Sequence, residues 1–233
     1  MTAWRAALVL VLAVAFAVSP FWVPDFGGFD PDSFPIAQHD PPVQPEGYAF
    51  AIWGLIFAWL VVGAGFGLWK RGTDERWEPM RLPLALSLGV GAIWLPVAVF
   101  SPVWATILIW AMLIPALIAL HRAPQDDVWF AAWPVGLYAG WLSAASCVAI
   151  GLLLGGYGFV SEDLAAIVMI AIAAVLALAI QSRLRRAPTY GIAVIWALVA
   201  IAVQNGLVAT PGQLALILAV FLVMPTIRSW RGF

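Results

Sequence analysis

The chain has 233 residues, of which 64% are hydrophobic and 10% are charged, with a formal net charge of −1 and a single cysteine, Cys147. Because soluble domains carry roughly 25% charged residues, this composition excludes a soluble globular protein and predicts an all-α integral membrane protein. The lone cysteine excludes an intramolecular disulfide or a multi-cysteine metal site, and no basic patch or stacking motif indicates a nucleic-acid partner.

Apolar runs of membrane-spanning length follow one another along the whole chain. A hydrocarbon core about 30 Å thick needs roughly 20 apolar residues per helix. In chain order the runs occupy residues 3–23, 47–69, 82–100, 102–121, 128–154, 163–182, 188–208 and 212–228. They predict eight transmembrane helices. The first run has the form of a signal peptide, but it continues to Val23, which favours a retained helix.

The placement of the basic residues supports this map. With the N-terminus inside the cell, all 11 Lys and Arg residues fall in cytoplasmic segments, and the outer segments hold none. Such a complete positive-inside bias is hard to obtain from a wrong number of spans. We therefore expect an integral protein of the bacterial inner membrane, with its N- and C-termini in the cytoplasm.

The longest connection, residues 24–46, lies on the outer side and is rich in Pro, Gly, Asp and Phe. Loops of this length without secondary structure are usually lids or disordered segments. Its phenylalanines, Phe26, Phe29 and Phe34, favour a loop that packs back onto the protein.

Ionisable residues are missing from the middle of the predicted spans, since all 12 acids also fall in connections. Proton relays and ion-coupled transporters generally need such groups within the membrane, so both classes are disfavoured. Motifs for catalysis, metals and phosphate loops are absent, and we expect no enzyme and no metal site. His39 and His121 lie on opposite sides of the membrane and cannot share a metal within one subunit.

The fifth span has two distinct faces. Tyr138 and Trp141 share an aromatic face, whereas Gly136, Gly140 and Gly151 share a face of small residues. Small residues at four-residue steps allow close helix packing, either within the chain or in a dimer. We expect Gly140→Leu to disrupt this contact and Gly140→Ala to be much milder.

Three short motifs occur in a fixed order. The second span opens with Pro45-Glu-Gly-Tyr48-Ala-Phe50-Ala-Ile-Trp53, the third contains Trp94-Leu-Pro96, and the fifth contains Leu137-Tyr138-Ala-Gly-Trp141. Together they resemble the TspO/MBR family of tryptophan-rich sensory proteins, which is related to the mitochondrial translocator protein. The resemblance covers roughly residues 1–155, and residues 156–233 add three helices.

The resemblance implies a TspO-like five-helix bundle over 1–155 with a lid at 24–46, and a three-helix segment over 156–233. It implies an intramembrane aromatic pocket for a flat apolar ligand: a porphyrin or other tetrapyrrole, a sterol or a lipid. The residues implied to line that pocket are Tyr48, Phe50, Trp53, Trp94, Tyr138 and Trp141. Because of their depths, we expect the pocket in the outer half, between the second, third and fifth helices.

The leading functional hypothesis is a membrane sensor or carrier for such a ligand. The alternative is an accessory structural subunit of a larger, pigment-containing membrane complex. An uncoupled transporter is a third reading. The expected partners are membrane lipids, the small apolar ligand, and either a second copy of the chain or a larger membrane complex.

Overall fold

The computed structural model describes residues 3–23, 27–184 and 186–231, and this part of the chain contains eight helices long and apolar enough to cross a membrane. They are α1 (Trp4–Val18), α2 (Ile52–Arg71), α3 (Glu78–Phe100), α4 (Pro102–His121), α5 (Ala132–Gly156), α6 (Glu162–Gln181), α7 (Pro188–Asn205) and α8 (Thr210–Arg231). Three 3₁₀ segments accompany them: η1 (Ser19–Trp22), η2 (Pro31–Ser33) and η3 (Gly47–Ala51). Each predicted span corresponds to one helix, which confirms the all-α, eight-helix prediction.

Local sequence signals set several helix ends. Ser101 separates α3 from α4 in an extended conformation, and its side chain accepts a hydrogen bond from the Trp104 backbone N–H at 3.3 Å. Pro102 then occupies the first turn, where its missing N–H costs nothing. Ser161 caps α6 in the same way, and Glu162 and Asp163 in its first turn complement the helix dipole.

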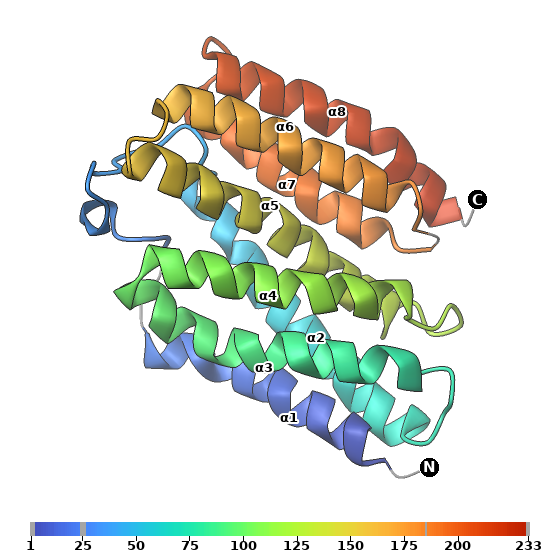
Figure 1. The fold of residues 1–233 in the computed structure, drawn as a ribbon. Helices are drawn as coiled ribbons and strands as arrows, with labels where there is room; N and C mark the ends of the chain where they lie inside the picture. The colour runs from blue at the N-terminus through green and yellow to red at the C-terminus, as the bar shows by residue number, and fades with distance from the viewer. Residues whose placement is uncertain (1–2, 24–26, 185, 232–233) are drawn as a thin grey trace.

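The helices run roughly antiparallel, and α5 lies at the centre (Figure 1). It packs against α4 on one side and against α6 and α7 on the other, with α2 crossing behind it. Within its most apolar window, 72% of α5 is buried, compared with 22% for α2. Helix α5 is therefore the core of the bundle, and α2 is a peripheral helix that faces lipid along most of its length.

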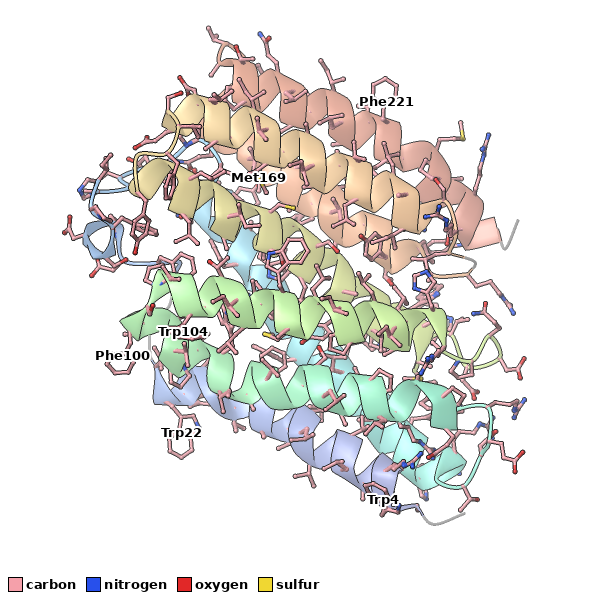
Figure 2. All side chains as sticks on the ribbon, viewed as in Figure 1. Trp4, Trp22, Phe100, Trp104, Met169 and Phe221 are labelled. Atoms are coloured by element: carbon pink, nitrogen blue, oxygen red, sulfur yellow. The ribbon has the colours of Figure 1, made fainter. Side chains whose placement is uncertain are left out.

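Alternating helix directions divide the connections between two ends of the bundle. We call the end with the start of α1 and the end of α8 the basic end, because every described Lys and Arg lies there. The opposite, acidic end carries Asp, Glu and the long loop. Figure 2 shows Trp22 and Phe100 pointing outward at the acidic end and Trp4 at the basic end, as expected for aromatic belts at two membrane interfaces.

The described part of the long loop, residues 27–46, packs back onto the acidic end, as predicted; residues 24–26, including Phe26, lie outside the described residues. Phe34 is buried against Gly156 at the end of α5. The Ile36 backbone N–H donates to the Gly156 carbonyl at 2.9 Å, and the Gln38 amide donates to the Glu162 carboxylate at 2.9 Å. The loop is thus tied to the α5–α6 connection.

The glycine face of α5 is filled by the chain itself. Gly136 and Gly140 lie against the start of α7, so that added Cβ atoms would overlap Thr189 and the Tyr190 backbone. The Tyr190 hydroxyl donates to Ser143 Oγ at 3.0 Å on the same interface. Of the two alternatives, internal packing and dimerisation, the structure shows internal packing for this face.

Candidate ligand-binding site

A cavity opens at the acidic end beneath the long loop, with about 540 Å³ of unfilled space including its mouth. Its walls come from the loop, η3, α3, α4, α5 and α7. The lining residues are Gly28, Phe29, Gln44, Pro45, Phe50, Trp94, Ile109, Trp141, Ala144, Ala145, Val148, Ala149, Leu152 and Ala197.

Aromatic side chains form the rigid parts of the cavity wall. Phe50 meets Trp141 edge-to-face, with ring centroids 5.9 Å apart, and Phe29 tilts over Trp94 at 6.5 Å. The Trp94 indole N–H donates to the Ala105 carbonyl at 2.8 Å, which fixes its ring between α3 and α4. Small side chains of α5, including Ala145 and Ala149, leave the space between these rings open.

Three of the six predicted site residues, Phe50, Trp94 and Trp141, line the cavity. Trp53 lies one layer behind it: its ring stacks on Phe57 at 5.2 Å and meets Trp141 edge-to-face at 6.2 Å.

Tyr138 and Tyr48 also lie outside the cavity. Tyr138 is fully buried, and its hydroxyl is 2.8 Å from Ser87 Oγ, which donates to the Met112 carbonyl at 2.7 Å. This chain of bonds joins α5 to α3 and α4 in mid-bundle. Tyr48 is about half exposed, and its ring lies edge-to-face with Trp196 of α7 at 5.4 Å.

The position of the cavity corrects the expectation that it lies between the second, third and fifth helices. No residue of α2 itself lines it; Phe50 belongs to the preceding segment η3, while α4 and α7 contribute Ile109 and Ala197. The Trp196 indole N–H donates to the Ala49 carbonyl at 3.0 Å. This bond helps hold η3, and with it Phe50, against α7.

Sequence reasoning missed the contributions of the loop end and of α7. The Pro42 carbonyl accepts a hydrogen bond from Asn205 Nδ2 at 2.8 Å, and the Glu46 backbone N–H donates to the Ala200 carbonyl at 3.2 Å. Gln44 is held between these two anchors. The proline-rich surroundings of Gln44 signal a rigid segment, whereas Ile109 and Ala197 are ordinary aliphatic residues that carry no signal of a site.

The cavity wall contains no ionisable side chain among its lining residues. No group of three potential metal ligands occurs in the described chain. The acids of the loop, including Asp30 and Glu46, lie at the same end of the bundle, and the described cations lie at the far end.

The ion pairs of the described Arg residues gather at the basic end, away from the cavity, whereas His39 faces Asp32 at 3.6 Å in the long loop. Asp127 accepts hydrogen bonds from Arg71 Nε at 2.8 Å and from the Trp77 indole at 3.0 Å, and these interactions lower the pKa of Asp127. Arg76 bonds to Asp74 and Asp126, and its hydrogen bonds lower the pKa of Asp74 to about 2. This network joins the α2–α3 loop to the α4–α5 loop.

Comparison with known proteins agrees with the resemblance seen in the motifs. The model of one family, described as TSPO-like protein, matches residues 30–227. This range runs from the long loop into α8 and therefore includes the three C-terminal helices. No curated protein and no solved structure matches the chain. Since the family model covers most of its length, the chain belongs to the TSPO-like protein family.

Proposed function

We propose that this TSPO-like protein is a membrane sensor or carrier that binds a flat apolar molecule in the cavity beneath its long loop. The ligand classes that fit this proposal are porphyrins and other tetrapyrroles, sterols and lipids. The observation that carries it is the cavity itself, an apolar space walled by Phe50, Trp94 and Trp141 and covered by the chain's own loop.

The walls support binding by shape and ring contacts. Aromatic pairs contribute about 0.5–1.5 kcal/mol each beyond the area that they bury. Trp141 lies between Phe50 and Trp53, and Trp94 is fixed by its bond to Ala105. These side chains are already held in place, so a ligand would lose little free energy in ordering them.

The same wall argues against catalysis. General acid–base and nucleophilic chemistry need a titratable or nucleophilic side chain at the reacting atoms. The lining residues offer only the Gln44 amide and the indoles as polar side-chain groups. We therefore propose a binding protein rather than an enzyme.

The test is to fill the cavity. Ala145→Trp places an indole inside the space, and Ala58→Trp places the same side chain on the exposed face of α2 as a matched control. Protoporphyrin and retinol, titrated against the protein in nanodiscs by tryptophan quenching, represent tetrapyrroles and isoprenoids. We expect saturable binding of at least one probe, weakened strongly by Ala145→Trp alone. Binding that is unaffected by Ala145→Trp, or absent with both probes, refutes the proposal.

The alternative function, an accessory subunit of a larger complex, relied partly on small-residue faces free to meet partner helices. The chain itself covers Gly136 and Gly140, and Gly63 and Gly67 of α2 lie against Phe130 and Trp77. The alternative is tested by purification in mild detergent, where a coloured or much heavier complex would favour it over the sensor.

We also propose that the basic end faces the cytoplasm of a bacterial inner membrane, so that the cavity opens toward the outer side. The support is the positive-inside rule applied to a bundle whose described cations all lie at one end.

A further inference from the structure

We infer that the cavity selects a neutral ligand with a hydrogen-bond acceptor and discriminates against carboxylates. The inference rests on the proposed function and narrows its ligand class to neutral molecules, so that a tetrapyrrole with free carboxylates, such as protoporphyrin, is disfavoured. It follows from three features of the cavity: an unused indole donor, an unused amide, and the separation of the cavity from every described Lys and Arg.

The donor is Trp141. Its side chain is 2% exposed and lines the cavity, yet its indole N–H donates to no residue in the described ranges 3–23, 27–184 and 186–231. The other tryptophan of the wall, Trp94, does have an acceptor, the Ala105 carbonyl. An indole N–H in an apolar interior gains free energy from an acceptor, and a carbonyl, hydroxyl or ether on the ligand can provide one.

The amide belongs to Gln44 at the edge of the loop. It lines the cavity beside Gly28, and its side chain has no hydrogen-bond partner in the part of the chain that the structure describes. An amide both donates and accepts, so Gln44 suits a hydroxyl or carbonyl headgroup. A neutral amide does not supply the charge that a buried carboxylate needs.

The charge distribution disfavours an anion. No Lys or Arg lines the cavity, and the described cations lie at the opposite end of the bundle. Two residues next to lining positions of the loop are acidic: Glu46 follows Pro45, and Asp30 follows Phe29. A carboxylate would lose its hydration without gaining a cation, which is strongly unfavourable. It would also pass acids of its own sign on entry.

The experiment compares retinol with retinoic acid, which share an apolar body and differ in the headgroup. Both are titrated at pH 8, where a carboxylic acid is ionised, in nanodiscs of neutral phosphatidylcholine, with empty nanodiscs correcting for partition. We expect retinol to bind about tenfold or more tightly than retinoate. Trp141→Phe keeps the ring and removes the N–H, and should weaken retinol binding about three- to tenfold.

Gln44→Arg supplies the missing cation and should shift the preference about tenfold or more toward retinoate. Gln213→Arg makes the same change on the exposed start of α8, at the same end of the bundle, and should leave the preference unchanged. If Gln44→Arg does not fold, the neutral-ligand inference is tested by the preference of the wild-type protein for retinol and by the loss of retinol affinity in Trp141→Phe.

Equal wild-type binding of the two probes, or a preference that does not respond to Gln44→Arg, overturns the neutral-ligand inference and leaves the proposed function standing. Saturable binding of neither probe overturns the inference; if protoporphyrin also fails to bind saturably, the proposed function falls with it.

Discussion

Gly140 of α5 lies directly against the backbone carbonyl of Tyr190 of α7, so close that any Cβ at position 140 would overlap the oxygen. The neighbouring obstacle is the backbone of a buried helix rather than a movable side chain. The contact sets the distance between the two helices, and α7 in turn supplies Ala197 to the cavity wall.

Gly140→Ala should therefore be clearly destabilising in its own right. Overpacking of this kind costs typically about 1–3 kcal/mol, and Gly140→Leu should cost more. Gly65→Ala is the matched control, because a Cβ there meets open space. Thermal unfolding in detergent should give equal melting temperatures for wild type and Gly65→Ala, a lower one for Gly140→Ala and the lowest for Gly140→Leu. Equal stability of the two alanine variants would contradict the packing described for α5 and α7.

Trp141→Leu should weaken retinol binding more than Trp53→Leu does. Trp141 lines the cavity, whereas Trp53 only supports it from behind, through an edge contact at 6.2 Å. Tryptophan quenching measures both, with Trp4→Leu at the basic end as the control for non-specific quenching. A larger loss of affinity from Trp53→Leu would place the ligand nearer α2 than the cavity lies.

Asn205→Ala should loosen the loop that covers the cavity. The variant removes the bond from Asn205 Nδ2 to the Pro42 carbonyl, and a bond of this kind contributes about 0.5–1.5 kcal/mol. Faster hydrogen exchange around residues 42–46 and faster retinol release are the expected results. Gln213→Ala, which removes a side-chain bond to the Leu207 carbonyl at the same end, should leave both unchanged.

Acid should weaken the ion-pair network of the basic end. The pKa of Asp74 is lowered to about 2 by hydrogen bonds from Arg76, and the pKa of Asp127 is lowered chiefly by Arg71. A folded-state pKa below the unfolded value means that the stabilisation is present above about pH 4 and is lost as pH falls toward about 2.

At pH 5, Asp127→Asn should be less stable than wild type, because Arg71 and Trp77 lose a charged acceptor. Between pH 5 and pH 2, the melting temperature of this variant should therefore fall less steeply than that of wild type. Glu75→Gln, an exposed acid of the α2–α3 loop with no ion pair in the described structure, should follow the wild-type profile. Parallel profiles for all three proteins would show that the network contributes nothing to acid sensitivity.

Accessibility of single cysteines tests the orientation. In a Cys147→Ala background, Asp32→Cys should react with an impermeant thiol reagent added to intact cells, because Asp32 is exposed in the long loop of the acidic end, which we propose faces outward. Ser182→Cys, exposed at the basic end between α6 and α7, should react only after lysis. The reverse pattern would place the cavity on the cytoplasmic side.

The eight helices could be predicted from sequence because a membrane imposes length and hydropathy on every span, and because the cations fall in alternate connections, which places them at one end of the bundle. The break between α3 and α4 has a local cause, because the capping Ser101 and Pro102 act on adjacent residues.

The cavity was only partly predictable. The aromatic motifs identify Phe50, Trp94 and Trp141, but helical spacing does not distinguish a ring that lines a space from one that packs behind it, such as Trp53. The motif that contains Tyr138 predicts a pocket residue, but Tyr138 lies outside the cavity and its hydroxyl bonds with Ser87. The contribution of α7 depends on contacts between residues far apart in sequence, for which one chain carries no local signal.

The close fit of α5 and α7 also has a consequence for biosynthesis. Tyr190 follows Gly140 by about 50 residues, and a ribosome adds ~5–20 residues per second. The glycine face of α5 is therefore made roughly 3–10 s before the segment of α7 that packs against it. During that interval lipid chains or the insertion machinery must occupy the groove, and α7 completes the bundle by displacing them.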